Sequence, residues 1–282
     1  MLTQIRTLRW WIWGLVCICN IQYGSAQELL VNVYGRQYTL LNGKWNAIID
    51  PYQQGRKTAI YRNRALKDKA DFKEYAFEGG LRLNVPSDWN SQIPELKYYE
   101  GTMWYARKFE INKKSDENLF LYFGAVNYRC RVYLNGTLIG SHEGGFTPFQ
   151  FNVTNVVKEG GNFLAVEVDN TRTADAIPAL SFDWWNYGGI TRDVMLVHTP
   201  KNYIRDYFIQ LDKYDSDRVH AEVQLSAQNA GQLVKIEIPE LKIANKVFTD
   251  GTGLAKATFR VRNLERWSPQ APKLYQVIVS SE

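Results

Sequence analysis

The sequence predicts an all-β protein built of two successive β-sandwiches. Short runs in which apolar and polar residues alternate recur roughly every ten residues, and turn-forming pairs such as Asn135-Gly136 separate them. No long amphipathic stretch that would form a helix interrupts this pattern. Aromatic residues make up 14% of the chain and charged residues 22%, a balance typical of globular proteins rather than disordered ones.

The first 26 residues are predicted to be a secretory signal. Arg6 and Arg9 provide the positively charged n-region, and residues 10–19 form an apolar run too short to span a bilayer. Gly24-Ser25-Ala26 is a small-residue cleavage site that leaves Gln27 first. We therefore expect an exported chain, periplasmic or extracellular, with no membrane contact after cleavage. The alternatives are a membrane anchor or a buried helix.

Charge and cysteine content exclude several classes of function. The formal net charge is only +5 and no basic stripe is present, so we expect no nucleic-acid partner. Cleavage of the signal leaves Cys130 as the one cysteine, on the apolar side of a predicted strand, where we expect a buried residue rather than a nucleophile. His142, His198 and His220 have no ligand-spaced partners, so we expect no metal site and no cofactor.

The first sandwich is expected to cover residues 27–200. Asn42-Gly43 predicts a turn, Trp45 begins a short strand that ends at Asp50-Pro51, and residues 52–80 are expected to be a surface excursion. Further strands are predicted over residues 103–111, 119–123, 128–134, 138–140, 149–153, 163–168 and 194–198.

A second, smaller, immunoglobulin-like sandwich is expected over residues 201–282. Aromatic residues become rarer from about residue 201, and strands with few aromatic residues are predicted at 219–225, 233–238 and 275–279. The last of these would leave a sheet edge without a partner strand, which we take as a sign of truncation.

Residues 182–194 are the most informative stretch of the chain. Adjacent glycines disfavour a helix and interrupt a strand ladder, so we expect an ordered loop between strands. Gly188 and Gly189 are expected to adopt backbone angles closed to other residues, and Arg192 to pair with Asp193. Aromatic faces stack on the C–H groups of a sugar and a carboxylate accepts hydrogen bonds from its hydroxyls. The candidate substrate-binding residues are Asp183, Trp184, Trp185, Asn186 and Tyr187.

Several motifs in order along the chain resemble the non-catalytic N-terminal part of family 2 glycoside hydrolases, which include β-galactosidases, β-glucuronidases and β-mannosidases. The motifs are Leu41-Asn42-Gly43-Lys44-Trp45, Trp104-Tyr105-Ala106-Arg107-Lys108-Phe109, Val132-Tyr133-Leu134-Asn135-Gly136 with Gly140 to Phe149, Asp183 to Val194, and Trp267-Ser268-Pro269 with Leu274-Tyr275. Each motif alone is weak, but five in order are specific. The Asp183 to Arg192 stretch looks closer to β-glucuronidase and β-galactosidase than to β-mannosidase.

The resemblance implies a jelly-roll sugar-binding domain, an immunoglobulin-like domain and then a catalytic (β/α)8 barrel. Enzymes of the family retain configuration and use two barrel glutamates about 5 Å apart. The acid/base glutamate normally follows an asparagine, and this sequence has no Asn-Glu dipeptide. We therefore expect the barrel to be absent, the chain alone to be inactive, and its partners to be a carbohydrate, that barrel and a further copy in a homo-oligomer.

The resemblance also assigns roles within the loop. The acid at the position of Asp183 accepts hydrogen bonds from a substrate hydroxyl, directly or through a bound ion; the alternative is that it caps backbone N–H groups. Trp184, Trp185, Asn186 and Tyr187 either line the sugar pocket or pack against the sandwich or the barrel. Two other functions stay open: a stand-alone secreted carbohydrate-binding module, and an adhesion or subunit-interface protein.

Overall fold

The computed structural model describes residues 29–63 and 76–282 of the 282-residue chain. The predicted secretory signal, residues 1–26, lies outside the described residues, as does part of the predicted surface excursion at residues 52–80. Within the described parts of the chain, no helix is long and apolar enough to cross a membrane.

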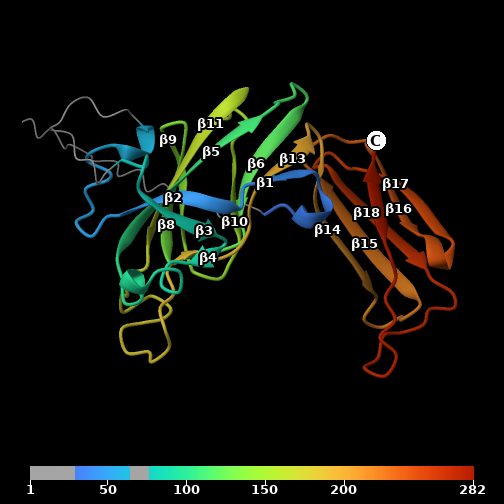
Figure 1. Ribbon diagram of the computed structural model, residues 1–282. Helices are drawn as coiled ribbons and strands as arrows, with labels where there is room; N and C mark the ends of the chain where they lie inside the picture. Colours follow the sequence, from blue (N-terminus) through green and yellow to red (C-terminus); the bar gives the residue numbers. More distant parts are fainter. Residues whose placement is uncertain (1–28, 64–75) are drawn as a thin grey trace, which may run out of the picture.

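Residues 38–200 form a first unit of antiparallel sheets, on the left in Figure 1. Its strands are β1 (Tyr38–Leu40), β2 (Gly43–Ile49), β3 (Leu81–Val85), β4 (Ser87–Asp88), β5 (Thr102–Ile111), β6 (Glu117–Phe123), β7 (Val126–Asn127), β8 (Arg129–Leu134), β9 (Thr137–Glu143), β10 (Phe149–Asn152), β11 (Gly160–Asp169), β12 (Gly189–Ile190) and β13 (Val194–Pro200). They form a four-stranded sheet, β1-β13-β6-β10, a six-stranded sheet, β3-β2-β5-β11-β8-β9, and a short sheet, β4-β12-β7.

The main core lies between the four-stranded and the six-stranded sheet. Trp45, Met103 and Val166 of the six-stranded sheet share one buried cluster with Leu121 and Leu196 of the four-stranded sheet. Alternate residues of each strand point into this layer, because successive side chains of a strand lie on opposite faces. The apolar area that is buried here, at roughly 25 cal/mol per Å², is the main source of the unit's stability.

Part of the six-stranded sheet is also buried on its outer face. Trp104, Tyr133 and Ala165 form a second cluster there, covered by the short 3₁₀ helix η2 (Ile60–Arg62). The indole Nε1 of Trp104 donates a hydrogen bond to Asp50 Oδ2 at 3.0 Å. The rest of that face carries charged side chains of β8 and β11.

The predicted Asn135-Gly136 hairpin is confirmed. β8 pairs with β9, and the connecting residues Asn135 and Gly136 have φ angles of +53° and +81°. Positive φ at both central residues is what a two-residue type I′ turn requires. The Asn135 side chain holds the turn in place by donating to Asn162 Oδ1 at 2.8 Å and to the Val156 carbonyl at 3.0 Å.

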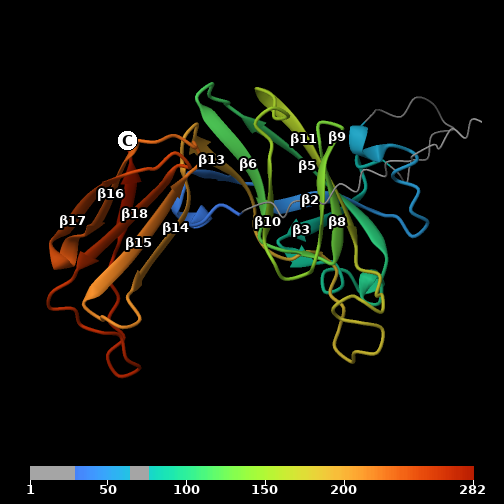
Figure 2. The ribbon, with the colours of Figure 1, turned by 180° about the vertical axis from the view of Figure 1, so that it is seen from behind.

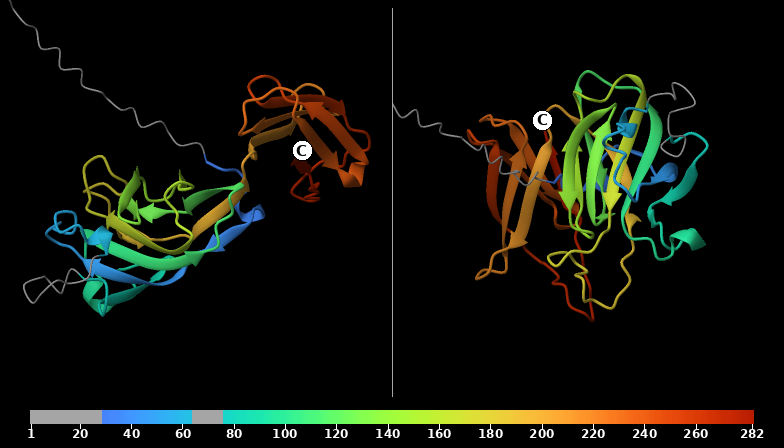
Figure 3. Two further views of the ribbon diagram at one scale, coloured as in Figure 1. Left: turned by 90° about the horizontal axis from the view of Figure 1, so that it is seen from above. Right: turned by 90° about the vertical axis from the view of Figure 1, so that its left-hand side faces the viewer.

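Residues 204–281 form the second unit, which contains two three-stranded sheets (Figures 1 and 2). Its strands are β14 (Ile204–Leu211), β15 (Arg218–Leu225), β16 (Leu233–Ile238), β17 (Ile243–Phe248), β18 (Leu254–Arg260) and β19 (Ile278–Ser281). The sheet orders are β14-β15-β18 and β17-β16-β19, and Val223 and Ile236 from the two sheets meet in one core. Figure 3 shows the chain passing between the units from β13 to β14, where Arg36 Nη2 donates to the Ile204 carbonyl at 2.6 Å.

The prediction of an all-β fold with sandwich units is confirmed, with three corrections to its elements. The sequence analysis missed β1, β3, β4 and β7 in the first unit and β14, β17 and β18 in the second. It also placed the last strand at 275–279 instead of Ile278–Ser281. It also expected the glycine pair to break any ladder. Gly189 instead lies in β12 and pairs with Asp88 on one side and Asn127 on the other, because a residue without a side chain fits between two backbones.

Candidate functional site

The loop that contains residues 182–187 presents an acid among exposed aromatic rings. Trp184 and Tyr187 are each 51% exposed, and Trp185 is 40% exposed. Asp183 is exposed as well, and its carboxylate makes no hydrogen bond or ion pair with any residue that the structure describes. These four residues form what we call the loop tip, whose acceptor oxygens and ring faces remain available to a ligand.

The rings of the tip are ordered by stacking on one another and on a neighbour. The rings of Phe182 and Trp184 stack with centroids 4.7 Å apart. Trp185 lies 5.4 Å from the Tyr98 ring and 6.3 Å from the Tyr187 ring. Such pairs contribute about 0.5–1.5 kcal/mol each when buried, and less on an exposed surface. The sequence analysis did not identify Tyr98, which lies far from the loop in the sequence.

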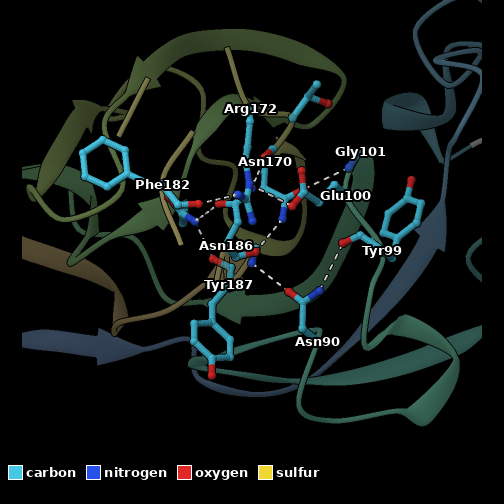
Figure 4. A network of polar contacts seen from close by, with 12 residues as sticks. Asn90, Tyr99, Glu100, Gly101, Asn170, Arg172, Phe182, Asn186 and Tyr187 are labelled. Atoms are coloured by element: carbon cyan, nitrogen blue, oxygen red, sulfur yellow. Dashed lines mark hydrogen bonds and ion pairs between the residues drawn. The ribbon is translucent and has the colours of Figure 1, made fainter. Parts of the chain in front are cut away.

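Asn186 lies beneath the tip and belongs to a network of buried asparagines that holds the loop (Figure 4). Its Nδ2 donates to the Asn170 carbonyl at 2.5 Å, and Asn170 Nδ2 donates back to the Asn186 carbonyl at 3.0 Å. Asn127 Nδ2 donates to Asn186 Oδ1 at 3.3 Å and to the Tyr187 carbonyl. Asn90 Oδ1 accepts from the Gly188 N–H at 2.9 Å. We call Asn90, Asn127, Asn170 and Asn186 the loop base.

The two glycines of the loop serve different steric purposes. Gly189 has φ +139°, so the prediction of a backbone closed to other residues is confirmed there. Gly188 has no such φ, but a Cβ at this position would lie 2.1 Å from Cζ2 of Trp89 and 2.6 Å from Nδ2 of Asn170. Gly188 is therefore required by a close approach to the buried Trp89 ring rather than by its own backbone angle.

An ion pair supports the start of the loop. Arg172 Nε lies 3.0 Å from Glu100 Oε1, and its Nη1 donates to the Phe182 carbonyl at 3.3 Å (Figure 4). A small hollow of about 160 Å³ lies beside this pair, between Tyr98 and Trp185. Ligand pockets usually measure roughly 300–1,000 Å³, so the loop by itself offers a binding surface and not an enclosed pocket.

The structure separates the five predicted substrate-binding residues into two groups. Asp183, Trp184, Trp185 and Tyr187 lie together at the exposed tip, whereas Asn186 is 3% exposed and its amide is used within the loop base. For Asn186 these contacts favour a supporting role over contact with a sugar. Substrate binding by any of the five stays a prediction.

The expected pairing of Arg192 with Asp193 is wrong. Arg192 Nη1 donates to the Phe146 carbonyl at 3.1 Å, whereas Asp193 accepts from Asn42 Nδ2 at 2.8 Å and from the Tyr34 hydroxyl at 3.2 Å. Adjacent residues on an extended chain point in opposite directions, which keeps the two charges apart.

Cys130 and His142 lie away from the tip in surroundings that account for them structurally. Cys130 is buried in the main core, and this burial raises the pKa of its thiol to about 12, which disfavours the nucleophilic thiolate. The His142 ring stacks on Phe149 at 4.1 Å, and burial lowers the pKa of its imidazole. Among the described residues, no three His, Cys, Asp or Glu side chains lie close enough together to hold a metal ion.

The fold and the loop together define the class of the protein: a β-sandwich protein whose first unit presents a carboxylate and aromatic rings on an ordered loop. The family model described as "Glycosyl hydrolases family 2, sugar binding domain" matches residues 39–200, and the model described as "Glycosyl hydrolases family 2" matches residues 202–282. The chain belongs to glycosyl hydrolase family 2.

Individual relatives agree with this assignment. A β-glucuronidase of Rattus norvegicus is 26% identical over 94% of the chain, which covers 44% of that protein. A β-galactosidase of Thermoanaerobacter pseudethanolicus is 30% identical over 78% of the chain, which covers 32% of it. Among solved structures, a β-glucuronidase of an uncultured Clostridium sp. has a TM-score of 0.70 and 28% identity, over 88% of the chain and 43% of that protein. The chain thus spans less than half the length of these relatives.

Proposed function

We propose that this chain is the N-terminal part of an exported, retaining β-glycosidase and that its loop tip binds the substrate. The observation that carries the proposal is the exposed Asp183 carboxylate, which has no partner among the described residues and lies among Trp184, Trp185 and Tyr187. Family membership and the names of relatives support a β-glucuronide or a β-galactoside as the substrate.

In this proposal the chain binds the sugar and does not cleave it. The Asp183 carboxylate accepts hydrogen bonds from sugar hydroxyls, and such charge-assisted contacts are stronger than neutral ones. The aromatic rings of the tip pack on the apolar faces of the sugar. The two glutamates that break the glycosidic bond belong to a barrel domain against which the tip lies, so the 282-residue chain alone is inactive.

The test compares this chain with the polypeptide that carries the barrel. The chain alone should release no nitrophenol from 4-nitrophenyl β-D-glucuronide or 4-nitrophenyl β-D-galactoside, whereas the longer polypeptide should cleave one of them. Asp183→Asn in the longer polypeptide should lower kcat/KM by about 10- to 100-fold, because a hydrogen bond to a charged group contributes about 1.5–3 kcal/mol.

Asp116→Asn is the matched control, because Asp116 is an exposed carboxylate on the turn before β6. It should leave kcat/KM unchanged. Hydrolysis by the chain alone, or an Asp183→Asn enzyme as active as the control, contradicts the proposal.

A second candidate function is a stand-alone carbohydrate-binding module, which the exposed rings of the tip favour. Isothermal titration of the chain with cellobiose and lactose discriminates between the two. Tight binding that Trp184→Ala abolishes supports the module, whereas no binding favours a chain whose tip needs the barrel. Size measurement in solution tests the homo-oligomer, and fractionation of cells tests export.

A further inference from the structure

The outer face of the six-stranded sheet carries a second hollow, outside the loop tip. It measures about 350 Å³, which lies within the usual range of ligand pockets, roughly 300–1,000 Å³. Its floor is formed by Glu167 of β11 and Arg131 of β8, which face each other across the ladder, and Arg56 lines it from the turn after β2. None of the lining residues belongs to residues 182–187. We call this the Glu167 hollow.

The floor of the hollow contains a buried acceptor without a partner. The Glu167 side chain is only 5% exposed, and its Oε1 lies 3.2 Å from Arg56 Nε and 3.5 Å from Arg131 Nη1. Its Oε2 has no hydrogen-bond partner in the part of the chain that the structure describes. Burial raises the pKa of the Glu167 carboxyl, although Arg56 and Arg131 act in the opposite direction. A buried acceptor that lacks a hydrogen bond is energetically unfavourable, so a ligand donor that reached Oε2 would be stabilised there.

The donors beside this acceptor are only partly used. The side chains of Arg56 and Arg131 are 44% and 45% exposed. Each guanidinium carries five N–H groups, and one nitrogen of each lies close to Glu167 Oε1. Arg129, at the far end of the hollow, is instead committed to Glu143 at 3.1 Å and to Thr173 Oγ1 at 2.9 Å. Partly exposed donors therefore lie beside an unpaired acceptor that is covered in the chain without ligand.

The balance of charge around the hollow favours a neutral ligand. Three arginines and three carboxylates line it: Arg56, Arg129, Arg131, Glu143, Glu167 and Asp169. An anion would meet Glu167 and Asp169, and a cation would meet the guanidinium groups. A neutral molecule with several adjacent hydroxyls can donate to a carboxylate and accept from a guanidinium at the same time.

We propose that the Glu167 hollow is a second binding site for a neutral saccharide. In the chain without ligand Oε2 is covered, so binding requires the partly exposed side chains of Arg56 and Arg131 to move aside. One sugar hydroxyl then donates to Glu167 Oε2, and neighbouring hydroxyls accept from the two guanidinium groups. Since none of the described residues that line the hollow is Phe, Tyr or Trp, and the His142 ring is already stacked on Phe149, hydrogen bonds dominate and the affinity is weak. The site does not depend on the proposed function, because it shares no residue with the loop tip.

The test is a titration of the whole ¹⁵N-labelled chain, followed by NMR, with methyl β-D-glucopyranoside and with its acidic counterpart, methyl β-D-glucuronopyranoside. The neutral glycoside should shift amide signals of β8, β9 and β11 in a saturable way, and more tightly than the acidic one. Arg131→Gln and Glu167→Gln should each weaken this binding at least fivefold. Arg131 is partly exposed, so its variant should fold even if Glu167→Gln does not.

Two control variants separate binding in the Glu167 hollow from binding elsewhere on the chain. Arg82→Gln removes an exposed arginine from the same sheet outside the hollow, and Trp184→Ala alters only the loop tip. Both should leave the shifts of β8, β9 and β11 unchanged. The proposal is overturned if those strands show no saturable shift, if Arg131→Gln binds as well as Arg82→Gln, or if the glucuronide binds more tightly. If the Trp184→Ala variant lost these chemical-shift changes, the binding would belong to the loop tip, and the proposal would be overturned as well.

Discussion

The tip and the base of one loop differ in almost every physical respect. The tip, around Asp183 and Trp184, is exposed and offers a carboxylate and ring faces that the protein leaves largely unused. The base, around Asn170 and Asn186, is buried and uses its amides in hydrogen bonds to the backbone. The comparison indicates that the base fixes the loop conformation, while the side chains of the tip remain exposed. Changes in the base should therefore affect stability, and changes in the tip should affect binding.

The largest effect on stability is expected from Gly188→Ala. The added Cβ would lie 2.1 Å from the Trp89 ring, and the buried, rigid indole cannot move aside without disturbing the core. We expect the free energy of unfolding to fall by about 3 kcal/mol, the upper part of the usual range for overpacking. Urea denaturation followed by tryptophan fluorescence measures it. Gly161→Ala is the control, because a Cβ there meets no atom of the described residues within 4 Å; equal losses would contradict the role of close packing.

Removal of one amide from the base should have the next largest effect. Asn170→Ala leaves the Gly101 N–H and the Asn186 carbonyl without their partners, which lie at 2.9 Å and 3.0 Å. Unpaired buried polar groups cost about 1–3 kcal/mol, and we expect a loss of stability in that range. Thermal unfolding by calorimetry tests this against Asn112→Ala, an exposed asparagine on the turn after β5. If both variants unfold at one temperature, the base does not hold the loop.

A smaller effect should appear as a pH dependence of stability at His142, a half-buried residue of β9 outside the loop. Burial lowers the pKa of its imidazole in the folded protein, so the unfolded state binds the proton more readily. The stabilisation is therefore fully present above the unfolded pKa, about 6.5, and is lost as the pH falls through the lower folded value. Urea denaturation between pH 7.5 and pH 5 should show His142→Gln losing less stability on acidification than the unaltered protein. If the free energy of unfolding of both proteins fell by the same amount between pH 7.5 and pH 5, His142 would not contribute to the pH dependence of stability.

The smallest effect on stability is expected at the tip. Trp184 is half exposed and, among the described residues, its ring stacks on Phe182 alone, which is itself exposed. Trp184→Ala should change the free energy of unfolding by no more than about 0.5 kcal/mol, as is usual for surface substitutions. Denaturation by urea measures this as well. A loss comparable to that of Asn170→Ala would show that tip and base form one structural unit and would remove the distinction between them.

Much of the fold could be predicted because it depends on local patterns. Alternation along residues 129–134 defines which face of β8 is buried, and Asn135-Gly136 defines the turn that follows. β14 and β17 were missed because their burial is incomplete, so their exposed positions carry apolar residues such as Phe208 and Phe248 that obscure the alternation.

The candidate site was predicted only in its tip. Acidic and aromatic residues within six positions of one another are visible in a sequence, whereas the base joins Asn90, Asn127, Asn170 and Asn186 from four separate segments. Nothing in a single sequence distinguishes a buried asparagine from one in a surface turn, because both are typical of irregular backbone. For the same reason Asn186 was grouped with the exposed residues beside it.

The way in which Asn42 and Asn135 are held has a consequence for the chemical ageing of the protein. Each precedes a glycine, the context in which asparagine most readily deamidates through attack of the next backbone nitrogen on the side-chain carbonyl carbon. Asn42 donates to Asp193 and accepts from the Val194 N–H at 3.0 Å, and Asn135 accepts from the Phe163 N–H at 3.0 Å while donating to Asn162. A carboxamide fixed at both ends cannot rotate into the reactive position. Isoaspartate should therefore accumulate at both turns only when the first unit unfolds, and it would record past unfolding in a stored sample.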